Sequence, residues 1–333
     1  MNQEHTMRAL VISKYGPPEV LRIEKLPIPV ADRGFVVIRV RAIGLNHAEL
    51  YMRRGEWGDV ARVTGIECAG EVHTDGDGRL EPGRRVIAIV GGMGRTLDGS
   101  YAEYVRVPAA NVAPIETSLS WEELAAIPEV YATAWICLHR ELRVVRGETL
   151  VVRGGTSAVG QAAINVAHDL GLHVLATTRS RDRFPLLQAL GAEPLLESTA
   201  LVHEIKERSP DGIDAVLELV GTRTLVDSLA CTRMGSGRVV YAGFLGGSPP
   251  IPAFDPLFHM PSGVKLSFFA SAFELGGPTA PLSDVPLQAI VDRVQAGAYK
   301  AKPVRVFTFD GIVDAHRLME ANGAGGKLVA AVS

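Results

Sequence analysis

The chain has 333 residues, of which 47% are hydrophobic, and this length favours two domains, each with its own core. Its 34 basic and 37 acidic side chains leave a net charge of −3, which gives no electrostatic basis for binding nucleic acid or an anionic membrane. The sequence has no apolar run of transmembrane length, no signal-peptide core in its polar opening residues, and only three cysteines, so we expect a soluble protein of the reducing cytoplasm.

The first third of the chain has the pattern of a compact β domain. Short apolar runs, separated by Gly-Pro, Asp-Gly and Pro-Gly turns, predict strands at Arg8–Ser13, Phe35–Ala42, Cys68–His73, Arg85–Val90 and Tyr101–Val107. The pattern changes near Ser120. There Ser120 and Glu123 form a capping box, which predicts a helix that reaches Ile127, is interrupted at Pro128 and resumes towards His139.

From Glu148 onwards the pattern alternates between strands and helices. Thr149–Val152 predicts a buried strand, Ala158–Leu170 an amphipathic helix closed by Gly171, and His173–Thr178 the next strand. Further strands are expected at Pro194–Leu196, Asp214–Val220, Arg238–Phe244, Val264–Ala270 and Val304–Phe309, and further helices at Pro286–Ala296 and Val313–Met319. The alternation predicts an α/β fold with a doubly wound parallel sheet.

The sharpest local motif is a glycine-rich turn between the strand at 149–152 and the helix that follows it. It has the form G-x-S-x-x-G, in which Ser157 replaces the middle glycine of the dinucleotide-binding motif. Gly155 permits the tight turn, Gly160 permits close packing of helix and strand, and the helix N-terminus offers free amides to a pyrophosphate. We expect the whole turn to bind cofactor: Gly155, Thr156, Ser157, Ala158, Val159 and Gly160. The second glycine comes one residue too late for a hydrolase elbow, so Ser157 is not expected to be a nucleophile.

The residues about 20 positions after such a turn distinguish NAD from NADP. An acid there would bond the ribose diol and repel a 2′-phosphate, but the end of this strand carries none. Asp182 is the first acid, and it fits the N-cap of the next helix because Pro185 then falls in the first turn. The sequence therefore favours NADP(H), with a binding loop of Thr178, Arg179, Ser180 and Arg183.

With these motifs placed, the chain resembles the zinc-independent quinone oxidoreductase branch of the medium-chain dehydrogenase/reductase superfamily. The resemblance covers nearly all of residues 7–332. The motifs that carry it are Gly44–Tyr51 with Arg53–Gly55, Thr64–Gly70, Glu81–Val86, Gly99–Tyr104, Tyr131–Trp135, the Gly155–Gly160 turn, and Gly326 with Lys327.

The resemblance implies a GroES-like, β-rich catalytic domain of residues 1–127 and 272–333. A Rossmann cofactor domain, residues 128–271, would be inserted into it, and the active site would lie between the two domains. It also implies a homodimer joined through the strand within Val264–Ser271, which is apolar enough to need cover.

A metal site is not expected. In zinc-dependent relatives a cysteine occupies the position of Asn46 and a histidine that of Ile66. An amide is a poor zinc ligand and isoleucine has no donor atom. The structural zinc of those relatives needs four cysteines, and the corresponding segment Gly91–Asp98 has none. A new site built from His47, Glu67 and Cys68 is disfavoured, because Cys68 fits a small buried apolar residue.

Without a Lewis acid, hydride transfer from a nicotinamide needs an acceptor that is already activated by conjugation, such as a quinone or an α,β-unsaturated carbonyl. The resemblance places Asn46 and Tyr51 beside the nicotinamide as hydrogen-bond donors and suggests Trp57 as an apolar wall. Further cofactor contacts are expected from the ends of the cofactor-domain strands and from the motifs nearby. These are Thr133, Leu219, Val220, Gly221, Gly243, Phe244, Phe269, Ala270, Ser271 and Lys327.

Two other functions remain open from the sequence. An enoyl-thioester reductase, acting on coenzyme A or acyl-carrier substrates, shares this fold and chemistry. A cofactor-binding protein with little turnover is the other. In every case the expected partner is a small-molecule electrophile or the cofactor itself.

Overall fold

The computed structural model describes residues 6–251 and 253–333. The chain divides into two compact units, and each is described by itself. Unit 1 comprises Met1–Ala132 and Ser271–Ser333, and unit 2 comprises Thr133–Ala270. The first division falls inside helix α3 (Pro128–Ile136). Within the described residues no helix has both the length and the apolarity needed to cross a bilayer.

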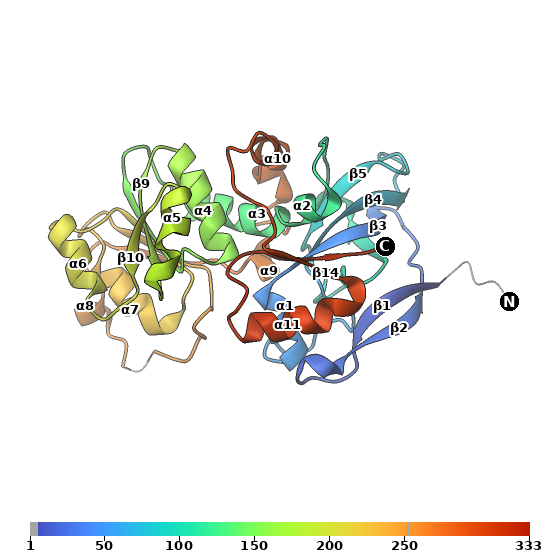
Figure 1. Cartoon of the computed structure of the whole chain (residues 1–333), viewed down its shortest axis with the longest axis horizontal. Helices are drawn as coiled ribbons and strands as arrows, with labels where there is room; N and C mark the ends of the chain where they lie inside the picture. Colours follow the sequence, from blue (N-terminus) through green and yellow to red (C-terminus); the bar gives the residue numbers. More distant parts are fainter. Residues whose placement is uncertain (1–5, 252) are drawn as a thin grey trace. The chain divides into compact units, whose positions relative to one another are not determined.

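Unit 1 is built on a largely antiparallel sheet of seven strands (Figure 1). Six of them have the order β14-β15-β3-β4-β5-β7, and the seventh, β6, pairs with β3 outside this order. A separate hairpin pairs β1 with β2. The elements of unit 1 are β1 (Thr6–Ile12), β2 (Leu21–Pro27), β3 (Phe35–Leu45), α1 (His47–Arg54), β4 (Glu67–Asp75), β5 (Arg85–Ile89), β6 (Tyr104–Pro108), β7 (Val112–Pro114), α2 (Trp121–Ala125), α9 (Ser271–Glu274), α10 (Leu287–Gln295), β14 (Arg305–Thr308), α11 (Ile312–Glu320) and β15 (Leu328–Ala331).

The long strand β3 lies at the centre of the unit 1 sheet and pairs with β15, β4 and β6. Alternate apolar side chains such as Val36, Ile38 and Val40 point into one core, which also holds Phe309 and Met319 from the end of the chain. Because β15 pairs antiparallel with β3, the last residues complete the sheet that the first residues began. The C-terminal segment is therefore part of the core of unit 1 and not an appendage.

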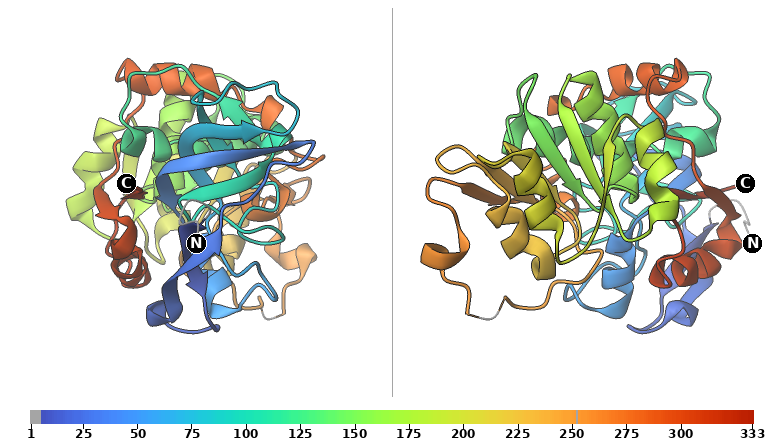
Figure 2. Two further views of the ribbon diagram at one scale, coloured as in Figure 1. Left: turned by 90° about the vertical axis from the view of Figure 1, so that its right-hand side faces the viewer. Right: turned by 60° about the vertical axis from the view of Figure 1, so that its left-hand side comes forward.

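Unit 2 is a six-stranded sheet, parallel throughout, with the order β10-β9-β8-β11-β12-β13. Helices cover both of its faces (Figure 2), as right-handed crossovers require when the strand order reverses between β8 and β11. This is the doubly wound Rossmann arrangement that the alternation predicted. Its elements are β8 (Thr149–Arg153), α4 (Ala158–Asp169), β9 (His173–Thr178), α5 (Phe184–Ala189), β10 (Glu193–Leu196), α6 (Leu201–Arg208), β11 (Ala215–Glu218), α7 (Thr222–Ala230), β12 (Arg238–Tyr241), α8 (Pro256–His259) and β13 (Lys265–Phe268).

Several predicted details of these elements are confirmed. Ser120 caps α2 by accepting from the amide of Glu123. The interruption expected at Pro128 comes earlier, because α2 ends at Ala125 and Pro128 is already the first residue of α3. The π-helical turn Cys137–Glu141 then extends α3 past His139. Gly171 follows α4 with a φ of +76°, the left-handed conformation that ends a helix.

Other predicted bounds were too long, and some elements were not predicted. The strand expected at Asp214–Val220 ends at Glu218, because the Glu218 carboxylate accepts from the amides of Val220 and Gly221 and so closes a turn. The strand expected at Tyr101–Val107 begins only at Tyr104. Strands β2, β7 and β15 and helices α1, α6, α7, α8 and α9 went unpredicted, since each is short or lacks a clear apolar period.

Candidate functional site

A buried polar cluster surrounds Asn46, at the point where β3 ends and α1 begins. Asn46 is 9% exposed, and its amide nitrogen Nδ2 donates to Glu67 Oε1 at 2.9 Å. Lys327, 6% exposed, donates from Nζ to Asn46 Oδ1 at 2.6 Å and to Glu67 Oε1 at 2.5 Å. The amide therefore has one orientation, with its oxygen facing the ammonium group and its nitrogen facing the carboxylate.

Glu67, the first residue of β4, is the common partner of this cluster. Its second carboxylate oxygen, Oε2, accepts from the backbone amide of Glu129 at 2.7 Å. The carboxylate fits only because residue 44 is glycine: a Cβ there would lie 2.3 Å from Glu67 Oε1. This steric restriction explains why the motif that begins at Gly44 needs a glycine.

Glu49, on the first turn of α1, is a second acid in the same interior. It is fully buried and accepts from the backbone amides of Asn46 at 2.7 Å and Ile66 at 3.2 Å. Burial raises the pKa of Glu49 to about 8, an effect that the Lys327 ammonium opposes and the Glu67 carboxylate adds to. Glu49 therefore holds a proton at neutral pH.

The predicted aromatic residues lie together in unit 1. The rings of Tyr51 and Trp57 are stacked, with centroids 5.4 Å apart and planes 18° apart. Phe273 of α9 packs against Trp57 in a tilted contact, with centroids 5.0 Å apart and planes 53° apart. We call Tyr51, Trp57 and Phe273 the aromatic platform.

The side chains around position 46 do not suit zinc. The ammonium of Lys327 already lies against Asn46 Oδ1, and a cation there repels a second one. Ile66 is buried and offers no donor, and Cys68 is fully buried, which raises the pKa of its thiol. In residues 6–251 and 253–333 no group of three or more His, Cys, Asp and Glu side chains is placed to hold a metal ion.

In unit 2 the glycine-rich turn has the close backbone packing that its sequence predicted. A Cβ on Gly160 would lie 2.5 Å from Gly154 O, and one on Gly155 would lie 2.8 Å from the Cβ of Ala176. The left-handed residue is Gly154, with a φ of +86°, so the conformational role assigned to Gly155 belongs to its neighbour. Ser157 caps α4, its hydroxyl accepting from the amide of Gly160 at 3.1 Å.

The loop after β9 differs from its prediction in one respect. Asp182 is not an N-cap: it lies in a 3₁₀ turn, Arg181–Arg183, that Ser180 caps by accepting from the Asp182 amide. The Ser180 hydroxyl also donates to the Asp182 carboxylate at 3.3 Å, so it already has partners. Thr178 is buried, whereas Arg179 is exposed and forms no ion pair with a described residue.

Two further loops at the same edge of the unit 2 sheet are joined through their backbones. Leu245 donates to Leu219 O at 3.1 Å, and Gly246 donates to Val220 O at 2.6 Å. Gly221, at a φ of +137°, and Gly243 both lie too close to backbone atoms to carry a Cβ. Among the other predicted residues of this unit, Phe244 packs on Tyr241, and Thr133 and Phe269 are buried, while Ala270 is half-buried.

Two predicted cofactor residues lie in unit 1. Lys327 belongs to the Asn46 cluster described above. Ser271 begins α9 and donates to Glu129 Oε1 at 2.7 Å. Both side chains thus have identified structural partners of their own.

Arg153, the last residue of β8, was not singled out from the sequence. It is 1% exposed, and its guanidinium contacts Glu197 at 2.5 Å, the carbonyl of Thr224 at 2.7 Å and Ser228 at 3.1 Å. Its charge thus joins the carboxyl end of β8, directly before the glycine-rich turn in the sequence, to the segment after β10 and to α7. The sequence does contain a signal that could have identified Arg153: it is a charged residue between the apolar strand 149–152 and the glycine pair 154–155.

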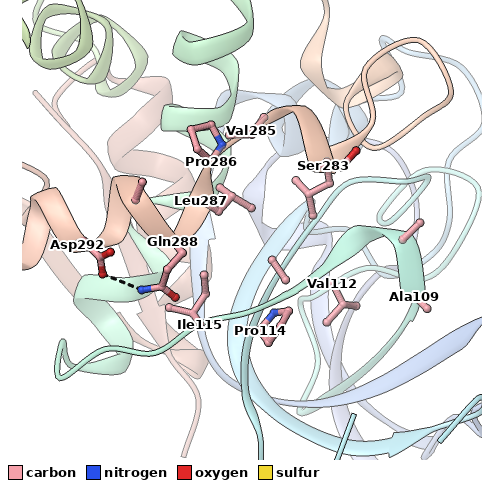
Figure 3. Close-up of a pocket in the computed structure, with 14 residues that line it drawn as sticks. Ala109, Val112, Pro114, Ile115, Ser283, Val285, Pro286, Leu287, Gln288 and Asp292 are labelled. Carbon is pink, nitrogen blue, oxygen red and sulfur yellow. Dashed lines mark hydrogen bonds between the residues drawn. The ribbon is translucent and has the colours of Figure 1, made fainter. Parts of the chain in front are cut away.

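A hollow of about 730 Å³ in unit 1 lies away from every predicted residue (Figure 3). It is lined mainly by apolar side chains from 109–115 and from 282–292. Its polar lining residues are Ser283, Gln288 and Asp292, and Gln288 donates to Asp292 Oδ1 at 2.8 Å. The hollow contains none of the groups that hydride transfer would use.

Comparisons with known proteins cover both units. Residues 32–117 match the family "Alcohol dehydrogenase GroES-like domain", and residues 158–274 match the family "Zinc-binding dehydrogenase". The chain is 28% identical over 337 residues to the quinone oxidoreductase of Rattus norvegicus, a match that spans 97% of each protein. The chain belongs to the medium-chain dehydrogenase/reductase superfamily.

Two further matches show the range of this superfamily. The solved structure of a mycobacterial protein complexed with NADPH has a TM-score of 0.86 and 25% identity, covering 98% of this chain and 99% of that one. A tetraketide synthase of Cochliobolus lunatus is 27% identical over 89% of this chain, but that match spans only 12% of the synthase. The GroES-like and Rossmann assignments, and the resemblance to quinone oxidoreductases, are confirmed.

Two buried histidines in unit 1, His47 and His316, have lowered pKa values, which make the stability of the folded chain depend on pH. His316 shares a 2.9 Å hydrogen bond with the hydroxyl of Tyr101, and burial together with Arg53 and Arg54 lowers its pKa to about 3. His47 is next to Asn46 in the chain, and burial, then Lys327 and Arg54, lower its pKa to about 4. Both rings are therefore neutral in the folded protein at neutral pH.

We predict that the protein is most stable near pH 6.5. Below that pH the unfolded chain takes up protons on His47 and His316 that the folded chain refuses, so stability falls by about 1.4 kcal/mol per pH unit for each ring. Between pH 4.5 and 8 the folded chain keeps the Glu49 proton that the unfolded chain loses, which lowers stability by about 1.4 kcal/mol for each unit that the pH rises. This term offsets one of the two histidines on the acid side, so the net slope is about 1.4 kcal/mol per pH unit on each side of pH 6.5. Urea unfolding between pH 5 and 8.5, followed by tryptophan fluorescence, measures this profile.

The replacement His316→Gln keeps a polar partner for Tyr101 but cannot titrate. It should reduce the acid-side slope by about 1.4 kcal/mol per pH unit, whereas His203→Gln, at an exposed site, should not change it. An unchanged slope in the His316 variant would show that this ring is not the group involved.

Proposed function

We propose that this protein is an NADPH-dependent reductase of quinones and α,β-unsaturated carbonyls that works without a metal. The observation that carries the proposal is the Asn46 amide, which Lys327 and Glu67 hold in one orientation at the position where zinc-dependent relatives have a ligand. A neutral donor there suits an acceptor that conjugation has already activated. The rat relative, a quinone oxidoreductase, supports this substrate class.

The residues of unit 2 fit a dinucleotide. The absence of a Cβ at Gly155 and Gly160 leaves the backbone tightly packed, and the capped N-terminus of α4 presents a positive dipole end to a pyrophosphate. The turn 155–160, the loop 178–183 and the segment 219–221 would hold the cofactor. When bound, a reduced nicotinamide supplies a hydride to the conjugated acceptor.

The contribution of unit 1 is to position the acceptor. Asn46 Nδ2 has two N–H groups, and the one that does not bond Glu67 has only long contacts, to Gly44 O at 3.4 Å and Glu49 Oε1 at 3.5 Å. This second N–H group would donate to the acceptor's carbonyl oxygen, and the Lys327 ammonium on the amide oxygen strengthens that donor by polarising the amide. The stacked rings of Tyr51 and Trp57 provide an apolar wall for a planar acceptor and exclude water from it.

A second candidate is an enoyl-thioester reductase. It is favoured by the match to a segment of the fungal tetraketide synthase, which spans most of this chain. The chemistry of Asn46 would be the same, since an enoyl thioester is also a conjugated carbonyl. The two candidates differ only in the acceptor that is used fastest.

We predict that the purified protein oxidises NADPH with a quinone or a conjugated alkenal faster than with an enoyl thioester, and that a chelator leaves turnover unchanged. Asn46→Ala should lower kcat by about 100-fold, because one donor to the developing oxyanion is removed, while NADPH binds as before. Gln288→Ala, in the hollow, is the matched control and should not change turnover. NADPH binding without oxidation by any acceptor would instead indicate a binding protein.

Cofactor choice depends on Arg179. Its exposed guanidinium has no carboxylate partner among the described residues, so a 2′-phosphate would gain a charge-assisted hydrogen bond. Arg179→Ala should weaken NADPH binding about tenfold and leave NADH binding unchanged, with the difference shrinking as salt is added. Arg181→Ala is the control, because that guanidinium lies over the Phe184 ring. Equal weakening of both cofactors would place Arg179 away from the phosphate.

We also propose a homodimer through β13. This strand is an edge of the unit 2 sheet, and its Leu266 and Phe268 are 39% and 55% exposed. Light scattering should give twice the 35.6 kDa of one chain, and Phe268→Glu should shift the mass to the monomer. Val30→Glu, at an exposed position of unit 1, should not change the mass. A monomeric wild type at micromolar concentration would refute this assembly.

A further inference from the structure

The aromatic platform does not end at an apolar side chain. Phe273, its last ring, is 49% exposed, and the guanidinium carbon of Arg95 lies 3.7 Å from the centroid of that ring. Tyr51 and Trp57 come from α1 and the turn after it, Phe273 from α9, and Arg95 from the loop 91–99 that follows β5. Three distant parts of the sequence thus form an apolar aromatic cluster with a cation at one end.

Arg95 uses little of its hydrogen-bonding capacity. It donates once, from Nη1 to the carbonyl of Ala272 at 3.2 Å, and no ion pair joins it to a carboxylate of the described residues. A guanidinium has five N–H donors. Burial without a compensating acid lowers the pKa of Arg95 from its usual value, but the group stays charged at neutral pH.

Other arginines of unit 1 show the contrast. Arg41 contacts Glu71 at 2.8 Å, Arg62 contacts Glu24 at 3.2 Å, and Arg106 contacts Asp32 at 2.8 Å. The charge of Arg95 is instead stabilised by an aromatic face and a carbonyl, both of which leave the edge of the guanidinium available. A partly buried cation of this kind attracts an anion more strongly than a solvated surface arginine does.

The position of Arg95 is also well fixed. Its backbone carbonyl accepts from the amide of Ala61 at 2.7 Å, and its own amide donates to Gly92 O at 3.0 Å. On the other side, Ser271 holds α9 through Glu129, and Gly91 donates to Leu275 O at 3.2 Å. Cation and platform therefore keep one geometry, as a specificity contact requires.

We propose that Arg95 selects acceptors that carry an anionic group, such as a sulfonate, carboxylate or phosphate, attached to the planar conjugated system. This inference rests on the proposed function, because it assigns the aromatic platform to the acceptor. The conjugated rings lie against Tyr51 and Trp57, and the anionic substituent lies at the guanidinium. Arg95 is a specificity-determining residue and takes no part in hydride transfer.

Two matched quinones test the proposal with the full-length protein: 1,2-naphthoquinone and its 4-sulfonate. Arg95→Met should lower kcat/KM for the sulfonate about tenfold through KM, and change the neutral quinone less than twofold. Comparing each quinone between wild type and variant cancels the difference in their redox potentials. Arg95→Lys should keep part of the preference, added salt should weaken it in the wild type, and Arg62→Met should not change it.

A purely structural role makes a different prediction. If Arg95 only fastens α9 through Ala272 and Phe273, its replacement lowers the melting temperature and slows both quinones equally. Either that result or an unchanged KM for the sulfonate in a folded variant overturns the proposal.

A binding measurement separates this proposal from the proposed function. Calorimetry with 2-naphthalenesulfonate and 2-naphthol needs no turnover. Tighter binding of the sulfonate by the wild type, lost in Arg95→Met, supports the anion contact even if no quinone is reduced, in which case only the proposed function fails. Equal binding of both probes by the wild type overturns the anion contact even if quinones are reduced.

Discussion

One buried carboxylate, that of Glu67, connects most of what is distinctive in unit 1. It accepts hydrogen bonds from the amide of Asn46, the ammonium of Lys327 and the backbone of Glu129, which lie in separate parts of the chain. A carboxylate removed from water is costly unless its oxygens are fully used, and removing one partner of such a pair typically costs 3–5 kcal/mol. The orientation of Asn46, the need for glycine at position 44 and the docking of the last strand all depend on satisfying this one charge.

The sequence predicted the architecture because its strongest patterns are local. The continuous apolar strand at 149–152, the stripe of the following helix and the glycine-rich turn specify a Rossmann unit within about 30 residues. The elements that were missed obtain their stability from elsewhere. Strand β15, Leu328–Ala331, is four residues long and is fixed by pairing with β3, almost 300 residues earlier in the chain. A window along the sequence does not contain such a contact.

The candidate site was also predictable only in part. Sequence motifs identified Asn46, Tyr51, Trp57 and the turn 155–160, but a motif does not show which side chains are in contact. The contact of Lys327 with Asn46, the proton on Glu49 and the buried guanidinium of Arg153 follow from desolvation and pairing in three dimensions. The wrong prediction at Asp182 also concerns which side chain makes a contact. Pro185 correctly indicated the start of α5, but the hydroxyl of Ser180, and not the carboxylate of Asp182, caps the 3₁₀ turn Arg181–Arg183 that precedes this helix.

The serine in the glycine-rich turn has a thermodynamic consequence of its own. Because Ser157 already accepts from Gly160, and Gln161 Nε2 donates back to Thr156 O at 2.9 Å, the first turn of α4 is closed without any ligand. A flexible glycine loop would lose conformational entropy on gripping a pyrophosphate, at roughly 1–2 kcal/mol for each residue that becomes ordered. In this protein the turn is already ordered when the chain folds, so the entropic cost is part of folding and not of ligand binding. The turn is preorganised, so under the proposed function the binding energy of its amides would appear as affinity instead of being consumed in shaping the loop.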